Sequence, residues 1–409
     1  MPFSNAPGEE QALAEAETLV TQPVKRLEGV LKKEHAPARS PASSVGGSLA
    51  SMRYAPAYTA DLPPARRDVV PIFRSVPETL PEAFASLSAA NVDSALPVFR
   101  KETDLIGVRL EGRYEVLSMI GKGTFGAVFR GRNVRTDGIV AIKVLIPSVV
   151  SGTTGLGCDN LLRRFELEAR AASQLTHGNV VRVFDFGRHE NCAFMIMQLL
   201  EGPTLMDIIE KESPVNPVTA CHWMADACSA LSEAHDNKLI HRDLKPHNIM
   251  LMKNAGGAGR IKVLDFGTVK GTDADWSGAG LTADGTVLGT AWYMSPEQAK
   301  GETLDVRSDL YAIAVILFEL VTGQLPFDSP HAAKVMLHHV KTPAPGLETA
   351  NSKLSQYPKL CAIVAQTLAK DRSDRPESAL KMQSALLIAA QEVEAVDRCD
   401  DLLVGATGS

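Results

Sequence analysis

The spacing of apolar residues changes near residue 108 and divides the chain into an irregular first part and a patterned second part. In the second part, short apolar or alternating runs predict strands at residues 114–117, 126–131, 140–145, 180–184, 193–197 and 261–264. Apolar residues at helical spacing predict helices at residues 161–175, 218–237, 306–322, 357–369 and 376–394. Because strands and one helix come first and helices follow, the pattern predicts an α+β fold with a small sheet-based lobe and a larger, mostly helical lobe.

Residues 1–107 are rich in Ala, Pro, Ser and Glu, and long stretches carry too little apolar surface to offset the entropy of ordering the chain. We therefore expect this region to be mostly disordered. Apolar residues recur at near-helical spacing over residues 9–34, although Pro23 interrupts them. This segment is either a transient, solvated helix or a docking helix for a partner or for the globular part. At the other end, residues 395–409 are expected to form a C-terminal tail, which is frayed from Asp400 onward.

The composition is that of an ordinary globular protein, and 409 residues are enough for two or three domains. A net charge of −6 gives no electrostatic reason to expect nucleic acid or an anionic membrane as a partner. The longest strictly apolar run, residues 310–318, is much shorter than the about 20 residues of a membrane span, and no secretory signal is recognisable. Six cysteines without ligand spacing predict reduced thiols in a cytoplasmic protein.

Residues 241–248, with the sequence HRDLKPHN, place an acid, a lysine and an amide within six residues. The carboxylate of Asp243 can accept a hydroxyl proton, the ammonium of Lys245 can neutralise charge on a transferred group, and the side-chain oxygen of Asn248 can hold a divalent metal. This spacing predicts transfer of a phosphoryl group from a nucleotide to a hydroxyl.

Residues 120–128 carry three glycines in the spacing GxGxxG, which lets the backbone approach phosphates closely. Dinucleotide-binding folds use the same spacing, but there the motif opens a helix, whereas strand-like residues follow Gly126. A hairpin that covers phosphates fits the pattern better. A flexible hairpin without a ligand stays an alternative.

Lys143 lies in an otherwise apolar strand, where its ammonium needs either a partner or a route to solvent. Glu168 lies in the predicted helix at residues 161–175 and is the candidate partner, because Glu166 falls on a different face of that helix.

The triplet Asp-Phe-Gly occurs twice, at residues 185–187 and 265–267. Asp265 ends a predicted strand and follows Asn248 by 17 residues, the length of a short hairpin, so it is the candidate metal ligand. Asp185 precedes the catalytic run and ends a predicted strand of the small lobe, and we interpret this copy as a turn.

In this combination the motifs resemble those of eukaryotic-type (Hanks-type) protein kinases, in particular bacterial serine/threonine kinases, over about residues 112–392. The resemblance implies a bilobal protein-kinase-like fold with a small antiparallel-sheet lobe at residues 108–197 and a hinge and helical lobe at residues 198–394. It also implies ATP and Mg²⁺, with Mn²⁺ as an alternative, in the cleft.

Position by position, the resemblance assigns catalysis to Asp243 and Lys245 and metal binding to Asn248 and Asp265. Contacts with ATP are implied at Ile120, Gly121, Lys122, Gly123, Thr124, Phe125, Gly126, Ala127, Val128, Ala141, Lys143, Glu168, Met197, Gln198, Leu199, Leu200 and Met250. Within that set, Glu168 is expected to fix Lys143 on the α- and β-phosphates.

The resemblance further implies a buried pair between Glu297 and Arg375, and a brace from Asp309 to the catalytic run. Lys245 and Thr290 point to Ser or Thr as the acceptor, because tyrosine kinases usually carry other residues at both places.

The implied function is transfer of the ATP γ-phosphoryl group to Ser or Thr of a protein substrate in signalling. Autophosphorylation is expected at Thr282 or Thr286, where Arg242 is placed to bind the phosphate. The motifs specify neither the substrate nor the oligomeric state.

Two other functions fit parts of the sequence. A pseudokinase scaffold would bind nucleotide or partners without chemistry, but Lys143, Asp243 and Asp265 are all retained. A dinucleotide-dependent oxidoreductase would use the Gly-rich turn, and the strand-like residues after Gly126 argue against it.

Overall fold

The computed structural model of the chain describes residues 99, 101–123, 126–146, 156–252, 259–266 and 290–407. The disorder predicted for the first part of the chain and the helix predicted at residues 9–34 lie outside the described residues. So do Thr124, Phe125, Thr282 and Thr286.

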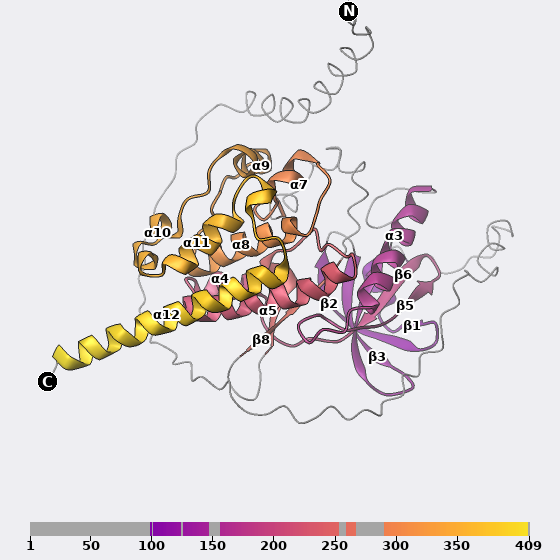
Figure 1. Cartoon of the computed structure of the whole chain (residues 1–409). Helices are drawn as coiled ribbons and strands as arrows, with labels where there is room; N and C mark the ends of the chain where they lie inside the picture. Colours follow the sequence, from indigo (N-terminus) through magenta and orange to yellow (C-terminus); the bar gives the residue numbers. More distant parts are fainter. Residues whose placement is uncertain are drawn as a thin grey trace, which may run out of the picture. The chain divides into compact units, whose positions relative to one another are not determined.

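The N-lobe is an antiparallel sheet with one long helix (Figure 1). Its strands are β1 (Arg109–Leu110), β2 (Tyr114–Gly123), β3 (Gly126–Asn133), β4 (Ile139–Leu145), β5 (Val183–His189) and β6 (Cys192–Met197). They pair in the order β1-β2-β3-β4-β6-β5. The helix α3 (Leu156–Ser173) packs against β5 and β6 through buried residues that include Phe165 and Ala169. The expected sheet lobe with one main helix is confirmed.

Alternation along the strands sends side chains to two faces of this sheet. On the face that we call outer, Phe129 and Ile142 are fully buried in one apolar cluster. On the inner face, Val128, Ala141 and Met197 pack in a second cluster together with α3. The inner face is therefore the one that carries several of the predicted ATP contacts.

Ordered packing of the N-lobe begins before the predicted boundary at residue 108. Phe99 and Leu105 are 5% and 0% exposed in the outer-face cluster, and Glu102–Leu105 forms a short 3-10 helix, η3. The side-chain amide of Asn191 bonds to both the N–H and the carbonyl of Phe99, each at 3.1 Å. The boundary was missed because these two anchors lie six positions apart among polar residues, which gives neither a helical nor a strand period.

The C-lobe is mostly helical. Its elements are α4 (Leu205–Glu212), α5 (Pro217–Asp236), η4 (Pro246–Asn248), β7 (Ile249–Met252), β8 (Arg260–Val263), α7 (Pro296–Lys300), α8 (Arg307–Thr322), α9 (Ala332–Lys341), α10 (Leu347–Ala350), η5 (Ser352–Gln356), α11 (Pro358–Thr367), η6 (Arg372–Asp374) and α12 (Ala379–Thr407). The helix α5 begins where the side chain of Asn216 accepts a hydrogen bond from the Val218 N–H at 2.9 Å. Nearly all of α8 is buried, so the apolar run at residues 310–318 is a core helix, as expected.

The last helix is longer than predicted. The helix was expected to end at residue 394 and the tail to fray from Asp400, but α12 continues to Thr407 and lies beside α5 (Figure 1). Ala389, Ala390 and Val393 continue its buried face, and the Tyr357 hydroxyl donates to Asp397 Oδ1 at 2.5 Å. These contacts hold α12 in place as far as Asp397.

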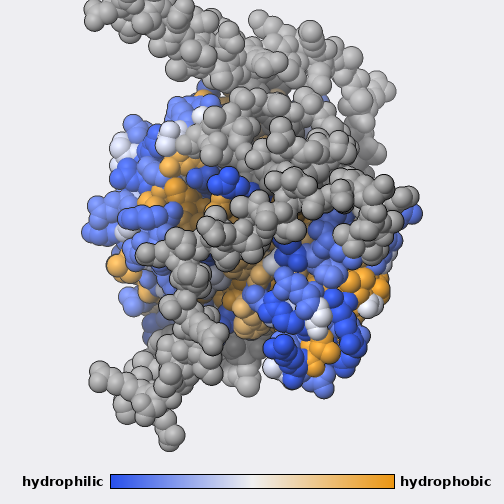
Figure 2. Space-filling model, turned by 90° about the vertical axis from the view of Figure 1, so that its right-hand side faces the viewer, coloured by the Kyte–Doolittle hydropathy of each residue, from blue (hydrophilic) through white to orange (hydrophobic). Residues whose placement is uncertain are grey.

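None of the helices that the structure describes combines the length and the apolar character that crossing a membrane requires. On the face seen in Figure 2, hydrophilic residues alternate with smaller apolar patches.

Candidate active site

The backbone of the catalytic run, residues 241–248, is hydrogen-bonded to a side chain in the first turn of α8. Asp309 accepts hydrogen bonds from the backbone N–H groups of His241 at 2.9 Å and Arg242 at 3.0 Å, and it pairs with His235 at 2.8 Å. Burial alone would raise the pKa of Asp309, but the contacts with His235 and His241 outweigh burial and lower it. The carboxylate therefore stays ionised, and the predicted brace is confirmed.

Four of the predicted residues lie together at the end of this run. Lys245 Nζ donates to Asp243 Oδ2 at 3.0 Å and to Thr290 Oγ1 at 3.3 Å. Asn248 Nδ2 donates to the Asp243 carbonyl at 2.8 Å, which orients the amide. An acid, a cation and the hydroxyl of Thr290 thus converge, although 45 positions separate Lys245 from Thr290.

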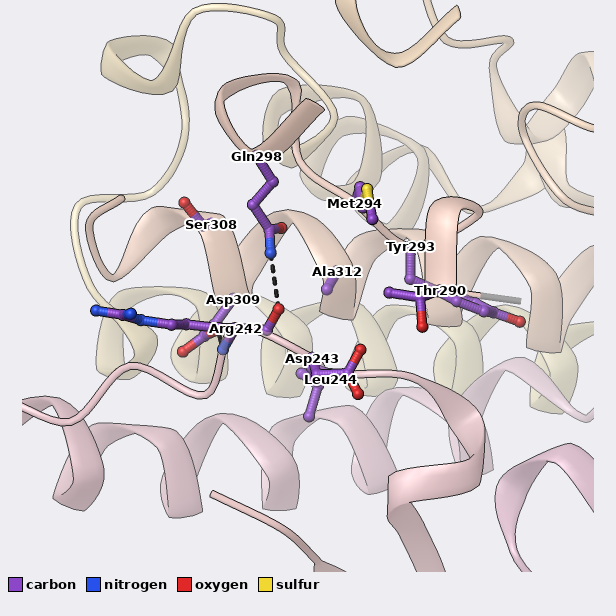
Figure 3. Close-up of a pocket in the computed structure, with 10 residues that line it drawn as sticks. All are labelled: Arg242, Asp243, Leu244, Thr290, Tyr293, Met294, Gln298, Ser308, Asp309 and Ala312. Carbon is purple, nitrogen blue, oxygen red and sulfur yellow. Dashed lines mark hydrogen bonds between the residues drawn. The ribbon is translucent and has the colours of Figure 1, made fainter. Parts of the chain in front are cut away.

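A small pocket beside Asp243 joins the catalytic run to the loop after Thr290 (Figure 3). Gln298 Nε2 donates to the Arg242 carbonyl at 2.7 Å across it, while the Arg242 side chain extends away from Asp243. The lining residues are Arg242, Asp243, Leu244, Thr290, Tyr293, Met294, Gln298, Ser308, Asp309 and Ala312. Gln298 was not predicted from sequence, because an amide in a helix carries no signal of a distant partner.

Lys143 is paired differently from the sequence prediction. Its Nζ lies 2.8 Å from Asp265 Oδ1, whereas Glu168 Oε1 is buried without a hydrogen-bond partner in the described residues. Burial raises the pKa of Glu168 to about 9 and so favours its neutral form. Burial would lower the pKa of Lys143, but Asp265 outweighs it and the pKa is raised. The predicted Lys143–Glu168 ion pair is therefore replaced by a Lys143–Asp265 pair.

The two predicted metal ligands lie on adjoining segments. The N–H of Leu264, next to Asp265, donates to the Asn248 carbonyl at 2.8 Å, so both residues stand at the same end of the β7–β8 pair. Carboxylate and amide oxygens are hard donors, and Mg²⁺ commonly takes one or two protein oxygens together with phosphate and water. The donor set fits Mg²⁺ bound with a nucleotide.

The Gly-rich residues form a hairpin, not the start of a helix. Gly121 pairs with Val128 and Gly123 with Gly126 across β2 and β3. Gly126 has φ +131°, and a Cβ there would lie 2.0 Å from the Val144 carbonyl oxygen, so only glycine fits. The strand that was expected after Gly126 is confirmed.

Two of the predicted ATP contacts turn their side chains away from the inner face. Ala127 is buried in the outer-face cluster, and Lys122, which pairs with it across the hairpin, forms an ion pair with Glu102. The Lys122 side chain thus points away from the inner face, on which other ATP contacts are predicted. Ile120 stands 52% exposed next to them.

The other predicted adenine contacts lie around the inner face and the segment after β6. Leu199 and Leu200 pack against the inner-face cluster, and Met250 is half-buried in β7. The Gln198 N–H donates to the Arg182 carbonyl at 2.8 Å. The Gln198 N–H is therefore already bonded, and its carbonyl is the remaining backbone group for the predicted hydrogen bond to adenine.

The first Asp-Phe-Gly triplet is part of a strand, which corrects the predicted turn. Asp185 lies in β5, and its Oδ2 accepts hydrogen bonds from Arg113 at 2.7 Å and from the Tyr114 hydroxyl at 2.8 Å. It ties one edge of the sheet to the start of β2. A turn was predicted because Asp and Gly are common in turns, and tertiary contacts override that preference here.

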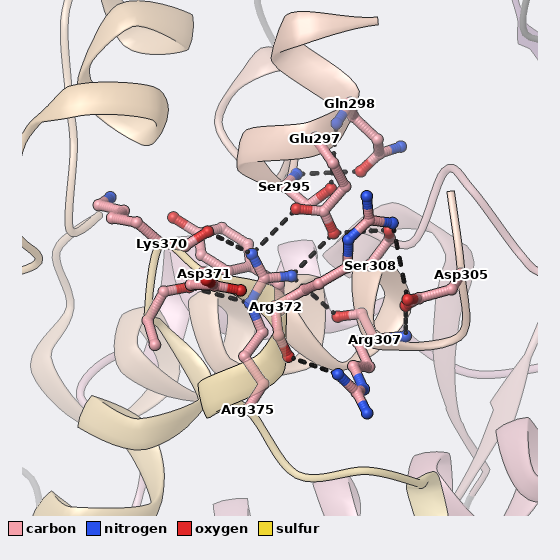
Figure 4. A network of polar contacts seen from close by, with 12 residues as sticks. Ser295, Glu297, Gln298, Asp305, Arg307, Ser308, Lys370, Asp371, Arg372 and Arg375 are labelled. Atoms are coloured by element: carbon pink, nitrogen blue, oxygen red, sulfur yellow. Dashed lines mark hydrogen bonds and ion pairs between the residues drawn. The ribbon is translucent and has the colours of Figure 1, made fainter. Parts of the chain in front are cut away.

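The predicted pair of Glu297 with Arg375 is confirmed (Figure 4). The guanidinium donates to both carboxylate oxygens, at 2.8 and 2.9 Å, and the Ser308 hydroxyl adds a bond of 2.7 Å to Glu297. Burial alone would raise the pKa of Glu297, but Arg375 lowers it, so the pair stays ionised. This bidentate pair anchors α7, which follows Thr290 in the chain.

A second buried contact, made by Tyr293 shortly before α7, was missed. The Tyr293 hydroxyl donates to Glu319 Oε2 at 2.6 Å, and burial raises the pKa of Glu319 to about 7. A signal was present in the sequence, because Glu319 is a carboxylate directly after the long apolar run at residues 310–318.

Comparison with known proteins agrees with this geometry. Residues 114–387 match the protein kinase domain family. The chain is 39% identical over 298 residues to the serine/threonine-protein kinase pkn3 of Myxococcus xanthus, covering 72% of this chain and 52% of that protein. It is 36% identical over 280 residues to the serine/threonine-protein kinase PrkC of Bacillus subtilis, covering 68% of this chain and 41% of that protein.

A third relative is the serine/threonine-protein kinase PknB of Mycolicibacterium smegmatis, 36% identical over 283 residues, 68% of this chain and 43% of that protein. The chain thus spans about half the length, or less, of these curated relatives. On the match over residues 114–387, with the sheet lobe, helical lobe and paired motifs described above, the chain belongs to the protein kinase domain family.

Proposed function

We propose that this chain is an ATP-dependent serine/threonine protein kinase that phosphorylates a protein substrate in signalling. The observation that carries the proposal is the convergence of Asp243, Lys245 and Thr290, with a hydrogen bond of 3.0 Å between Lys245 and Asp243. The Lys143–Asp265 pair supports a nucleotide beside that cluster. The relatives with matching kinase domains bear serine/threonine-protein kinase names.

In the proposed reaction the substrate hydroxyl oxygen bonds to the γ-phosphorus of ATP, ADP leaves, and the hydroxyl proton passes to Asp243. Lys245 lies between Asp243 and Thr290, where its ammonium offsets charge on the transferred group. Thr290 then lies where the acceptor Ser or Thr is presented. Positioning and charge neutralisation supply most of the rate in this type of transfer.

The nucleotide is proposed to lie under the Gly-rich hairpin, with adenine against the inner face and its phosphates near Lys143. Asn248 and Asp265 would hold Mg²⁺, which supplies positive charge to the phosphates when bound. Without the metal, Asp265 forms an ion pair with Lys143. Binding of nucleotide and metal is therefore expected to break this ion pair.

We further propose a cytoplasmic location, where ATP is available. Cys192, Cys221 and Cys228 are buried free thiols, which suits a reducing compartment. The acidic net charge of −6 favours a protein partner over nucleic acid or an anionic membrane.

Substitution of the proposed base tests this function. Asp243→Asn removes the proton acceptor, and general-base loss commonly lowers rates by about 100- to 10,000-fold. Transfer of phosphate from ATP to a generic Ser/Thr protein substrate is expected to fall by at least about 100-fold. Lys143→Met is expected to abolish transfer as well. Asp236→Asn, an exposed acid at the end of α5, is the matched control and should keep wild-type activity.

The same incubations also test autophosphorylation. Wild-type protein treated with ATP and Mg²⁺ is expected to carry phosphate on Thr282 or Thr286, detected by mass spectrometry, and Lys143→Met protein is expected to carry none. Full activity of Asp243→Asn would contradict the kinase assignment. Nucleotide binding by the wild type without any transfer would favour a scaffold instead.

A further inference from the structure

The segment from Phe99 to Leu110 precedes the part of the chain that matches the protein kinase domain family, residues 114–387. It nevertheless belongs to the N-lobe. Phe99, Leu105 and Leu110 are all buried in the outer-face cluster. Backbone hydrogen bonds join the segment to β2, from the Gly107 N–H to the Val116 carbonyl at 2.8 Å and from the Val116 N–H to the Val108 carbonyl at 2.9 Å.

This segment runs antiparallel to β2 and so reaches the tip of the Gly-rich hairpin. Arg109 pairs with Glu115, and residues earlier in the segment lie beside residues later in β2. Glu102 Oε1 lies 2.8 Å from Lys122 Nζ, and the two side chains are 13% and 61% exposed. The hydrogen bond from Lys122 lowers the pKa of Glu102, so the carboxylate is ionised at neutral pH. Among the residues that the structure describes, Glu102 is the charged partner of Lys122.

The pair lies on the face opposite to the proposed nucleotide. Lys122 is opposite Ala127 in the hairpin, and directly opposed residues of an antiparallel pair share a face. Ala127 is buried in the outer-face cluster, whereas the next residue, Val128, packs on the inner face. The Lys122 ammonium is therefore held on the outer face, and loss of Glu102 would loosen the hairpin without sending a new cation toward the phosphates.

We propose that Glu102 is a positioning residue, which fixes the Gly-rich hairpin over the nucleotide by holding Lys122 from the outer face. This inference rests on the proposed function, in which the hairpin covers the phosphates of ATP. Glycines leave the hairpin with many backbone conformations, and closing over a ligand costs the entropy of selecting one. A tether that restricts the free hairpin lowers that cost and strengthens nucleotide binding.

Calorimetric titration of the full chain with MgADP tests the role of Glu102 without relying on phosphate transfer. Glu102→Gln is expected to raise the dissociation constant of MgADP about two- to fivefold, the range that a partly exposed ion pair provides. Glu111→Gln is the matched control, since Glu111 pairs with Arg113 at the other end of β2 and does not touch the hairpin tip. It should bind MgADP like the wild type.

Two further measurements separate positioning from general weakening of the lobe. Lys122→Ala should reproduce the effect of Glu102→Gln, and the double variant should bind no more weakly than either single variant, because the two side chains act through one contact. The exchanged pair Glu102→Lys with Lys122→Glu should restore affinity. The melting temperatures of the Glu102→Gln and Glu111→Gln proteins should agree, which excludes a loss of folded protein as the cause.

The outcomes distinguish this inference from the proposed function. If the wild type binds MgADP and Glu102→Gln binds it equally well, the positioning role is overturned and the kinase proposal stands. An equal loss of affinity in Glu111→Gln would also overturn it, since the effect would not be specific to the hairpin. If the wild type does not bind MgADP, the proposed function fails and the inference fails with it.

Discussion

Two identical triplets in this chain show that a residue's role follows from its place in the fold. Asp265 lies two residues after β8, with φ +52°, and contacts Lys143. Asp185 lies in a sheet strand and accepts bonds from Arg113 and Tyr114. Spacing from the catalytic run was enough to choose Asp265 as the candidate ligand. It could not reveal the partners of Asp185, which lie 71 and 72 positions away.

Parallel substitutions in the two triplets test this difference. Asp265→Asn removes a proposed metal ligand and the partner of Lys143, and phosphate transfer is expected to fall by at least about 100-fold. Asp185→Asn weakens two hydrogen bonds of a partly exposed carboxylate, and the expected loss is about 1 kcal/mol of stability with transfer retained. Transfer assays and thermal unfolding of both variants provide the comparison. Equal loss of transfer in both would contradict the assignment.

At the scale of elements, the sequence predicted what local periodicity encodes and missed what depends on distant packing. Helices α5, α8 and α11 lie within about one residue of the predicted ranges at most ends. The strand predicted at residues 180–184 is displaced, and β5 covers Val183–His189. Val180 instead forms a parallel bridge with Val263 of the C-lobe. Two adjacent valines, Val180 and Val181, are compatible both with a strand of the N-lobe sheet and with a bridge to the C-lobe. The sequence alone therefore could not distinguish these two positions.

The segment before β1 carries a prediction of its own, because its buried side chains lack a periodic pattern. Leu105 is 0% exposed, and Leu105→Ala is expected to destabilise the protein by about 2–5 kcal/mol. Its neighbour Ile106 is 48% exposed, so Ile106→Ala is the matched control and should change stability by less than about 0.5 kcal/mol. Chemical denaturation of both variants measures the difference. Similar small effects would mean that the segment is not part of the folded lobe.

At the scale of the whole molecule, contacts join the two lobes. The sequence predicted the chemical type of partner in such a contact but not which residue provides it. An acid partner for Lys143 was predicted, and Glu168 was preferred to Glu166 because Glu166 falls on a different face of the predicted helix. In the structure Asp265, which follows β8, lies 2.8 Å from the Lys143 ammonium, while burial raises the pKa of Glu168 and favours its neutral form. Protonation depends on burial, and burial is a property of the assembled lobes.

The pH dependence of global stability gives a test of one such buried group. Glu319 is 7% exposed, and its pKa is raised by burial from the usual 4.5 to about 7. Between these two values the unfolded chain ionises while the folded protein keeps its proton, so stability falls as pH rises, by about 1.4 kcal/mol per unit at most. This contribution is complete below pH 4.5 and is lost above about pH 7.

Glu319→Gln removes the titration but retains a side-chain oxygen that can accept the bond from Tyr293. Its free energy of unfolding is therefore expected to depend less on pH between about 5 and 7 than that of the wild type, with the two curves parallel above pH 8. Glu377→Gln, whose side chain is 66% exposed, is the matched control and should follow the wild-type curve. Denaturation at a series of pH values measures all three proteins. Identical slopes for Glu319→Gln and the wild type would show that Glu319 ionises normally, and that its contact with Tyr293 is then an anionic one at neutral pH.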